Sequence, residues 1–278
     1  MKISSIFAIL TASAILAACD FLDEYNPNSV TVGNYYTSEE DIVASLNGVY
    51  TSLTQSYVAD NYHYFTDVRA NATVVTNSGA NSGIPYQFYN YTLTEENVYV
   101  YNRYSQLYKI ISRANTLFAH LGDVSYATPS ARDTYEAEAR FLRAYFYFEL
   151  VRRYQNIPLI TTVLTQEEAN VAEPASAEKI FDFIISECTE LSTLLPVDYT
   201  KMPGSEYGRA TKGAALALKA RAALYVASPL FNSNNDKNKW VAAAEAAYEL
   251  IGQSSTLGYQ LDGSFSNLFG ATNTASSE

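Results

Sequence analysis

The sequence predicts an all-α protein built from helix pairs stacked side by side, and three patterns support this prediction. Apolar residues recur at intervals of three and four over several stretches, which is the spacing of one face of an α-helix. Several of these stretches are rich in alanine, whose small side chain lets neighbouring helices approach closely. Residues that begin or stop helices bound most of them. We expect helices near residues 38–53, 97–120, 131–154, 177–194, 212–227 and 240–251.

The stretch from Glu136 to Ile160 is the anchor of this prediction. Its apolar residues lie on two adjoining helical faces, one formed by Ala139, Leu142, Phe146 and Leu150 and the other by Phe141, Tyr145 and Phe148. A helix that is apolar over so much of its circumference is expected to be buried between neighbours. Glu149 stands four residues before Arg153, the order that favours a surface ion pair. Pro158 disfavours helix at the preceding residue, so the chain should leave the helix extended.

The other helices have recognisable ends. Ser38 followed by Asp41 resembles a capping box, and Ser176 is expected to cap a later helix. Gly122 ends the second helix, and Pro196 marks the end of the fourth. These signals set the order of the helices along the chain.

Composition excludes some classes of function. The net charge is −11 and the isoelectric point about 4.7, so no basic surface is available for a nucleic acid. His63 and His120 are the only histidines and have no second ligand at metal-binding spacing. Cys188 fits a small buried residue in a helix, and the helical spacing of Trp240 places its ring in the core. No metal site or cofactor is predicted.

Tyrosine is unusually frequent, with 24 residues against one tryptophan. One interpretation is that these rings pack in the core and over the surface, where tyrosine is common at partly buried positions. The other is that some of them form a surface for neutral polar ligands, because a tyrosine ring is flat and amphipathic. Composition alone leaves both interpretations open.

The N-terminus is typical of a secreted lipoprotein. Residues 1–18 combine a short positive start with an apolar run, as in a signal peptide. The small residues directly before Cys19 resemble a bacterial lipobox, in which Cys19 would be lipidated and begin the mature chain. Cleavage by an ordinary signal peptidase, with an incidental cysteine, is the alternative. Residues 19–36 are then an acidic, extended tether, and residues 37–278 are the helical domain.

The segment from Tyr57 to Leu93 lacks helical periodicity and carries two aromatic clusters. A long irregular segment inside a compact protein is usually functional or disordered, and its aromatic residues argue against disorder. We predict a ligand surface here, with the contact residues Tyr86, Phe88, Tyr89, Asn90 and Tyr91 and, as second candidates, Asp67, Arg69 and Asn71. Aromatic rings can cover the C–H faces of a sugar while amides or charged groups bind its hydroxyls. The alternative is that these rings pack the loop onto the helices.

Three motifs resemble the SusD/RagB family of nutrient-binding outer-membrane lipoproteins of Bacteroidetes. The first is the run AEARFLRAYFYF, followed after a short gap by IPLI, at residues 137–160. The second is the I-x-R-A-N element from Ile111 to Asn115, and the third is GRATKGAA from Gly208 to Ala215. The sequence departs from the family at Gln155, where the family often has glycine. The resemblance implies irregular tetratricopeptide-like helix pairs with an inserted, aromatic-rich loop that contributes to the ligand site.

The resemblance also implies a function. A SusD-like protein at the cell surface would bind an extracellular nutrient, most often a glycan, and deliver it to a SusC-like TonB-dependent transporter beneath it in the outer membrane. A helical-repeat adaptor or a peptide-binding lipoprotein of the RagB type is the alternative. No catalytic motif is present, so we predict binding without catalysis. Family members are commonly about twice as long, and the sequence ends where their second half would begin.

Overall fold

A computed structural model describes residues 32–55, 58, 62–75, 83–198, 208–261 and 263–265. The predicted signal peptide, Cys19 and most of the polar turn between the two aromatic clusters lie outside these residues. By its internal contacts the chain divides after Tyr36 into two units. In the first unit, α2 (Val32–Tyr35) is a short helix, so the expected extended tether is wrong at these residues.

The second unit contains the six predicted helices, each within three residues of the expected bounds. They are α3 (Glu39–Thr51), α5 (Val98–His120), α6 (Pro129–Tyr154), α8 (Ala177–Leu194), α9 (Lys212–Ala227) and α10 (Lys237–Gly252). Shorter helical segments are η2 (Ser52–Thr54), η3 (Tyr64–Val68), α4 (Tyr86–Tyr89), α7 (Gln166–Asn170) and α11 (Ser254–Leu257). The described residues contain no β-strand, and one isolated bridge pairs Ile157 with Ala175. The all-α prediction is therefore confirmed.

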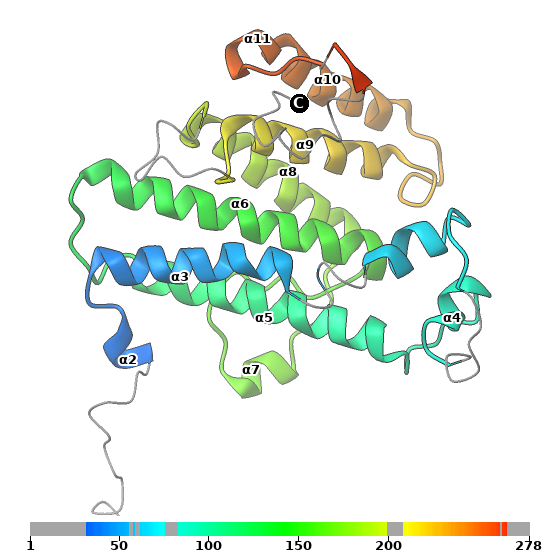
Figure 1. Cartoon of the computed structure of the whole chain (residues 1–278), viewed down its shortest axis with the longest axis horizontal. Helices are drawn as coiled ribbons and strands as arrows, with labels where there is room; N and C mark the ends of the chain where they lie inside the picture. The colour runs from blue at the N-terminus through cyan, green and yellow to red at the C-terminus, as the bar shows by residue number, and fades with distance from the viewer. Residues whose placement is uncertain are drawn as a thin grey trace, which may run out of the picture. The chain divides into compact units, whose positions relative to one another are not determined.

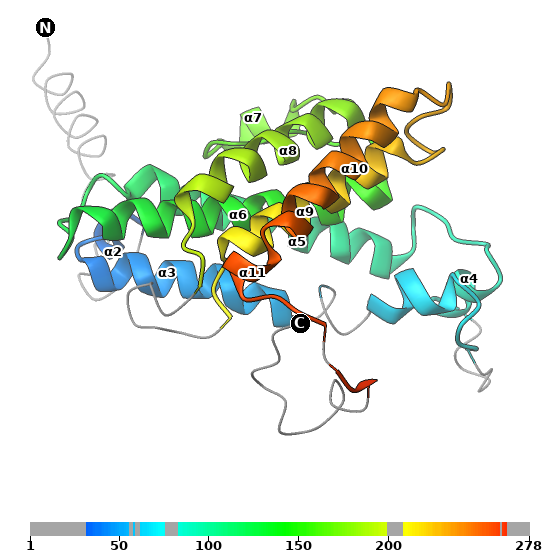
Figure 2. The same ribbon diagram turned by 90° about the horizontal axis from the view of Figure 1, so that it is seen from above.

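The helices of this unit are stacked in a regular order. Helices α3, α5 and α6 contact one another, and the stack then continues from α6 to α8, α9 and α10 (Figures 1 and 2). Because consecutive helices are also spatial neighbours, short connections are sufficient between α5 and α6 and between α9 and α10. The longer connections are the aromatic segment between α3 and α5, the excursion between α6 and α8, and residues 195–211 between α8 and α9.

Helix α6 buries the first of its two predicted faces, whereas Phe141 and Tyr145 of the second face are only partly buried. Leu142, Phe146, Phe148 and Leu150 are each at most 1% exposed. The helix begins with proline at its first turn, where the missing N–H costs nothing. Both predicted caps are present: Ser38 and Asp41 form the expected capping box of α3, and the Ser176 hydroxyl accepts a hydrogen bond from the N–H of Lys179 at the start of α8.

The chain leaves α6 through a residue with left-handed backbone. Gln155 has φ of 59°, a conformation that glycine adopts more easily than any other residue. The glycine that the resemblance implies at this position would adopt this backbone with less strain. The excursion from Asn156 to Ser176 is closed by the Ile157–Ala175 bridge, with N–O distances of 3.1 and 2.9 Å. Its two ends are therefore fixed beside each other.

Two expectations about single residues have different outcomes. Cys188 is fully buried, and burial raises the pKa of its thiol to about 12. Trp240, in contrast, is 39% exposed, so its predicted place in the core is wrong. It lines a shallow hollow at the surface together with residues of α9 and α10. Helical spacing alone could not show whether this face is covered by another helix.

No described helix is long and apolar enough to cross a membrane.

Candidate ligand surface on the aromatic loop

The predicted ligand residues lie in two described segments, residues 62–75 and 83–97, which connect α3 to α5. The segments are not wholly irregular. Residues Tyr64–Val68 form a π-helical turn, η3, and Tyr86–Tyr89 form the short helix α4, at the right of Figure 1. Both helical turns are too short to produce a periodic pattern, which is why the sequence showed none.

Phe88 is the buried centre of this region. Its side chain is 0% exposed, and its ring meets Phe65 edge-on at 4.9 Å and Tyr64 at 5.8 Å between centroids. Tyr64 in turn stacks on Tyr99 of α5 at 5.4 Å. The expectation that Phe88 contacts a ligand is therefore corrected: its ring packs the loop onto α5.

Asn97 fastens the second segment to the start of α5. Its side-chain oxygen accepts hydrogen bonds from the N–H groups of Tyr99 and Val100, which caps the helix. Its amide nitrogen donates to the carbonyl of Ile84 at 3.1 Å and to Oε1 of Gln87 at 2.9 Å. One buried side chain thus fixes the position of α4 relative to the scaffold.

A buried charge cluster fastens the first segment to α6. The carboxylate of Glu149 is paired with Arg103 at 2.8 Å and with Arg152 and Arg153 at 2.7 Å each. Three positive charges against one leave this cluster with a net charge of +2. The expected ion pair between Glu149 and Arg153 is present, but it is buried and not on the surface.

Aromatic rings cover this excess of positive charge. The ring of Tyr62 faces the guanidinium groups of Arg103, Arg152 and Arg153 at 5.3–5.7 Å, and its hydroxyl accepts a hydrogen bond from Arg152 at 2.8 Å. Phe65 faces two of the same arginines. Cation–π contacts of desolvated arginine stabilise such an arrangement. No local sequence pattern indicates it, because Tyr62, Arg103 and Arg152 lie far apart along the chain.

Of the other predicted rings, Tyr91 is exposed and Tyr86 and Tyr89 are partly buried. The hydroxyl of Tyr91 donates to the carbonyl of Arg69 at 2.7 Å, and the Arg69 guanidinium lies 5.2 Å from the centre of the Tyr91 ring. Tyr86 and Tyr89 form a second ring pair, 5.6 Å apart. Among the described residues, no ring contact joins the two pairs.

The polar candidates lie at the turns of the same surface. Asn71 has φ of 57° and lies three residues after the end of η3, and Asp67 within η3 is exposed. Asn90 is exposed, and its side-chain oxygen Oδ1 accepts hydrogen bonds from the N–H and the hydroxyl of Thr92. The structure thus brings Arg69 and Tyr91 into contact. Asp67, Asn71 and Asn90 are exposed, and each lies within two residues of Arg69 or Tyr91 along the chain.

Comparison with known proteins identifies the family. The model for SusD-like proteins, described as starch-binding and associating with the outer membrane, matches residues 20–224. The chain belongs to the SusD-like family. A SusD-like protein of Formosa agariphila is 27% identical over 278 residues, which cover 99% of this chain and 50% of that protein. A SusD-like protein of Bacteroides ovatus is 25% identical and is matched over 85% of this chain and 41% of its own length.

Solved SusD-like structures share the fold. A laminarin-binding SusD-like protein gives a TM-score of 0.71 at 26% identity, over 87% of this chain and 50% of that one. A SusD-like protein from Bacteroides fragilis gives 0.70 at 24% identity, over 88% and 44%. The chain therefore spans about half the length of the relatives it matches.

The motifs that resemble other SusD-like sequences form internal contacts in this structure. Asn115 of the I-x-R-A-N element donates to the carbonyls of Ile160 and Thr162 and accepts a hydrogen bond from Arg143. Arg209 of the GRAT element pairs with the buried carboxylate of Glu138 at 3.0 Å. These residues hold separate segments of the SusD-like fold together.

Proposed function

We propose that this SusD-like chain binds an extracellular glycan through the exposed residues Arg69, Asn71, Asn90 and Tyr91 and the partly buried Tyr89, with Tyr86 and Asp67 beside them. The bound glycan would pass to a SusC-like TonB-dependent transporter. The proposed role is capture without turnover. Its chemical basis is the combination of tyrosine rings with amides and one guanidinium, which suits a ligand that has C–H faces and many hydroxyls.

The backbone of Tyr91 is the observation that carries this proposal. Tyr91 has φ of 60°, although it is bulky and a left-handed backbone costs such a residue free energy. Its side chain is nonetheless 54% exposed, so burial of the ring does not offset that cost. The strain holds the ring against Arg69 at the surface, where a ligand could reach it. Strained residues of this kind concentrate at binding sites.

The family supports the class of ligand. Its description names starch binding and association with the outer membrane, and one structural relative binds laminarin. Laminarin oligosaccharides and maltooligosaccharides are therefore the first ligands to test. Positioning by Asn97 and by the charge cluster around Glu149 would keep the surface preformed, which lowers the entropy lost on binding.

Replacing Tyr91 with alanine is expected to weaken glycan binding about ten-fold or more, because an anchoring ring would be lost. Isothermal titration calorimetry against the oligosaccharide panel measures this effect. Tyr91→Phe keeps the ring and should retain most of the affinity. Tyr248→Ala removes an exposed tyrosine of α10 and is the matched control. A Tyr91→Ala protein that binds as well as the Tyr248→Ala protein would contradict the proposal.

We also propose that Cys19 carries a lipid anchor, on the basis of the apolar run and small residues before it. The variant Cys19→Ala is expected to move the protein from the membrane fraction to the soluble periplasmic fraction of cells. Cys188→Ala, which removes the other cysteine, should leave the protein in the membrane fraction. Equal membrane association of the Cys19→Ala and unmodified proteins would disprove this anchor.

A further inference from the structure

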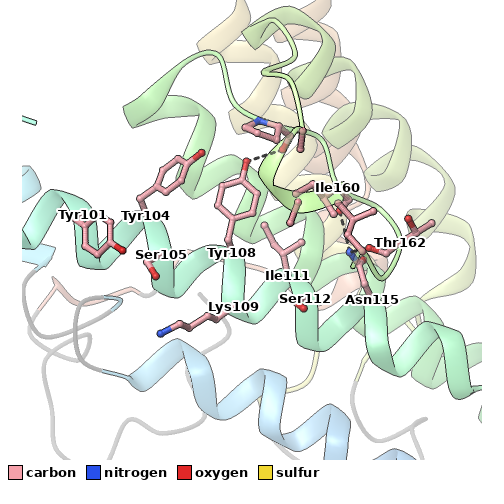
Figure 3. Close-up of a pocket in the computed structure, with 14 residues that line it drawn as sticks. Tyr101, Tyr104, Ser105, Tyr108, Lys109, Ile111, Ser112, Asn115, Ile160 and Thr162 are labelled. Atoms are coloured by element: carbon pink, nitrogen blue, oxygen red, sulfur yellow. Dashed lines mark hydrogen bonds between the residues drawn. The ribbon is translucent and has the colours of Figure 1, made fainter. Parts of the chain in front are cut away.

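A second hollow lies on α5, away from the aromatic loop. It has a volume of about 460 Å³, and its walls are one side of α5 and the excursion between α6 and α8 (Figure 3). None of the predicted loop residues lines it. It shares only the helix α5 with the surface proposed above.

Three tyrosines line the α5 wall of this hollow. Tyr101, Tyr104 and Tyr108 lie within two turns, so their Cα atoms span about 10 Å along the helix axis. Tyr104 and Tyr108 are held firmly, since their rings are 4.9 Å apart and Tyr104 also meets Tyr154 edge-on at 5.0 Å. Tyr101 is 66% exposed and stands at the mouth. The wall thus offers two rings held in place and a third, exposed ring at the mouth.

The opposite wall is also preformed. Tyr108 donates to the carbonyl of Pro158 at 2.7 Å, and Asn115 donates to the carbonyls of Ile160 and Thr162 (Figure 3). Arg143 donates to the carbonyl between them, that of Thr161. Because these carbonyls already accept from side chains and the N–H of Ile160 donates to the Tyr147 hydroxyl, the wall is a poor template for an extended peptide that would add to it as a strand. A ligand that binds by ring stacking and hydroxyl contacts fits this wall better.

Unused polar groups lie along the edge of the hollow. Within the described part of the chain, the hydroxyls of Ser105 and Ser112 and the amino group of Lys109 have no hydrogen-bond or ion-pair partner. Lys109 is the one ionised residue in the lining, which contains no carboxylate, although the chain as a whole has a net charge of −11. The local charge therefore favours a ligand with a negative group at this edge.

We propose that this hollow is a second saccharide site, which takes a short oligosaccharide carrying a carboxylate or sulfate group. Its sugar rings stack on Tyr101 and Tyr104, its hydroxyls bond to Ser105 and Ser112, and its acidic group lies near Lys109. This site is independent of the loop surface, so either proposal can fail without the other.

The test is calorimetry with acidic tetrasaccharides of three kinds, galacturonate, mannuronate and a sulfated galactan, each beside a neutral counterpart such as the methyl ester. At least one acidic ligand is expected to bind more tightly than its neutral counterpart, and added salt should reduce the difference. Tyr101→Ala should weaken binding about ten-fold, and Lys109→Ala should remove the preference for the acidic form. Both side chains are exposed, so folding should be unaffected, and circular dichroism checks this.

The loop variant is the reciprocal control. Tyr91→Ala should leave binding of the acidic ligand unchanged, whereas Tyr101→Ala should leave binding at the loop unchanged. Failure of all three acidic ligands to bind in the millimolar range would overturn the proposal. The proposal would also be overturned if the Tyr101→Ala and Lys109→Ala proteins bound the acidic ligand as tightly as the unmodified protein does. Loss of this binding in the Tyr91→Ala protein alone would overturn it too. So would binding of tetraglutamate, an acidic peptide, as strong as that of the acidic saccharide.

Discussion

Replacing Glu149 with alanine is expected to lower the free energy of unfolding by about 3–5 kcal/mol, because three buried arginines would lose their shared partner. The carboxylate is 2% exposed and lies within 2.8 Å of each of the three guanidinium groups. Chemical denaturation measures the loss. Glu136→Ala, on the same helix, is the control, since Glu136 pairs with Arg132 at the surface. An exposed pair of this kind contributes only about 0–1 kcal/mol.

Glu149 should also make the free energy of unfolding depend on pH in the acid range. Burial raises the pKa of Glu149, but the positive charges of Arg153, Arg152 and Arg103 lower it by more, so its folded pKa lies below the ordinary 4.5. The carboxylate's contribution is therefore complete above pH 4.5 and is lost as the pH falls through the folded pKa. Denaturation curves recorded over this range should show a shallower acid-side loss for Glu149→Gln. Parallel curves for the two proteins would mean that Glu149 does not carry the effect.

Arg209→Ala is expected to cost a similar 3–5 kcal/mol, because it leaves the carboxylate of Glu138 buried without its charged partner. Glu138 is 0% exposed, pairs with Arg209 at 3.0 Å and accepts a hydrogen bond from Tyr50 at 2.6 Å. These contacts join α3, α6 and the chain before α9, so the loss should also appear as a lower melting temperature.

A double variant separates the ion pair from the packing. Arg209→Met combined with Glu138→Leu removes both charges and keeps apolar volume, so it should be more stable than Arg209→Ala alone. Arg132→Ala, which removes an arginine from a surface pair, is the single-site control and should change stability little. A double variant less stable than Arg209→Ala would show that the charge pair stabilises the native state beyond its desolvation cost.

The sequence predicted the helices well because each depends on local spacing. The capping box at Ser38 and the apolar faces of α6 involve residues within a few positions of each other, so their consequences can be worked out from the chain alone. Trp240 shows where this reasoning fails. Its spacing is that of a core residue, but whether a helical face is covered depends on which other helix lies over it.

The candidate site was predicted only in part. The aromatic segment between α3 and α5 was recognised from its composition, but composition could not separate Phe88, which is fully buried, from Tyr91, which is half exposed. The left-handed backbone of Tyr91 and its contact with Arg69, 22 residues earlier, depend on the folded path of the loop. The hollow on α5 was missed because its second wall comes from a different part of the chain.

The sequence by itself determined the helical class, the order of the helices, the buried face of α6 and the resemblance to SusD-like proteins. These follow from periodicity, capping and motif spacing, which are local properties. Only the tertiary structure decided which aromatic rings are buried, which charges are desolvated and where hollows lie on the surface. Those depend on contacts between residues such as Arg103 and Glu149, 46 positions apart, whose pairing no local pattern records.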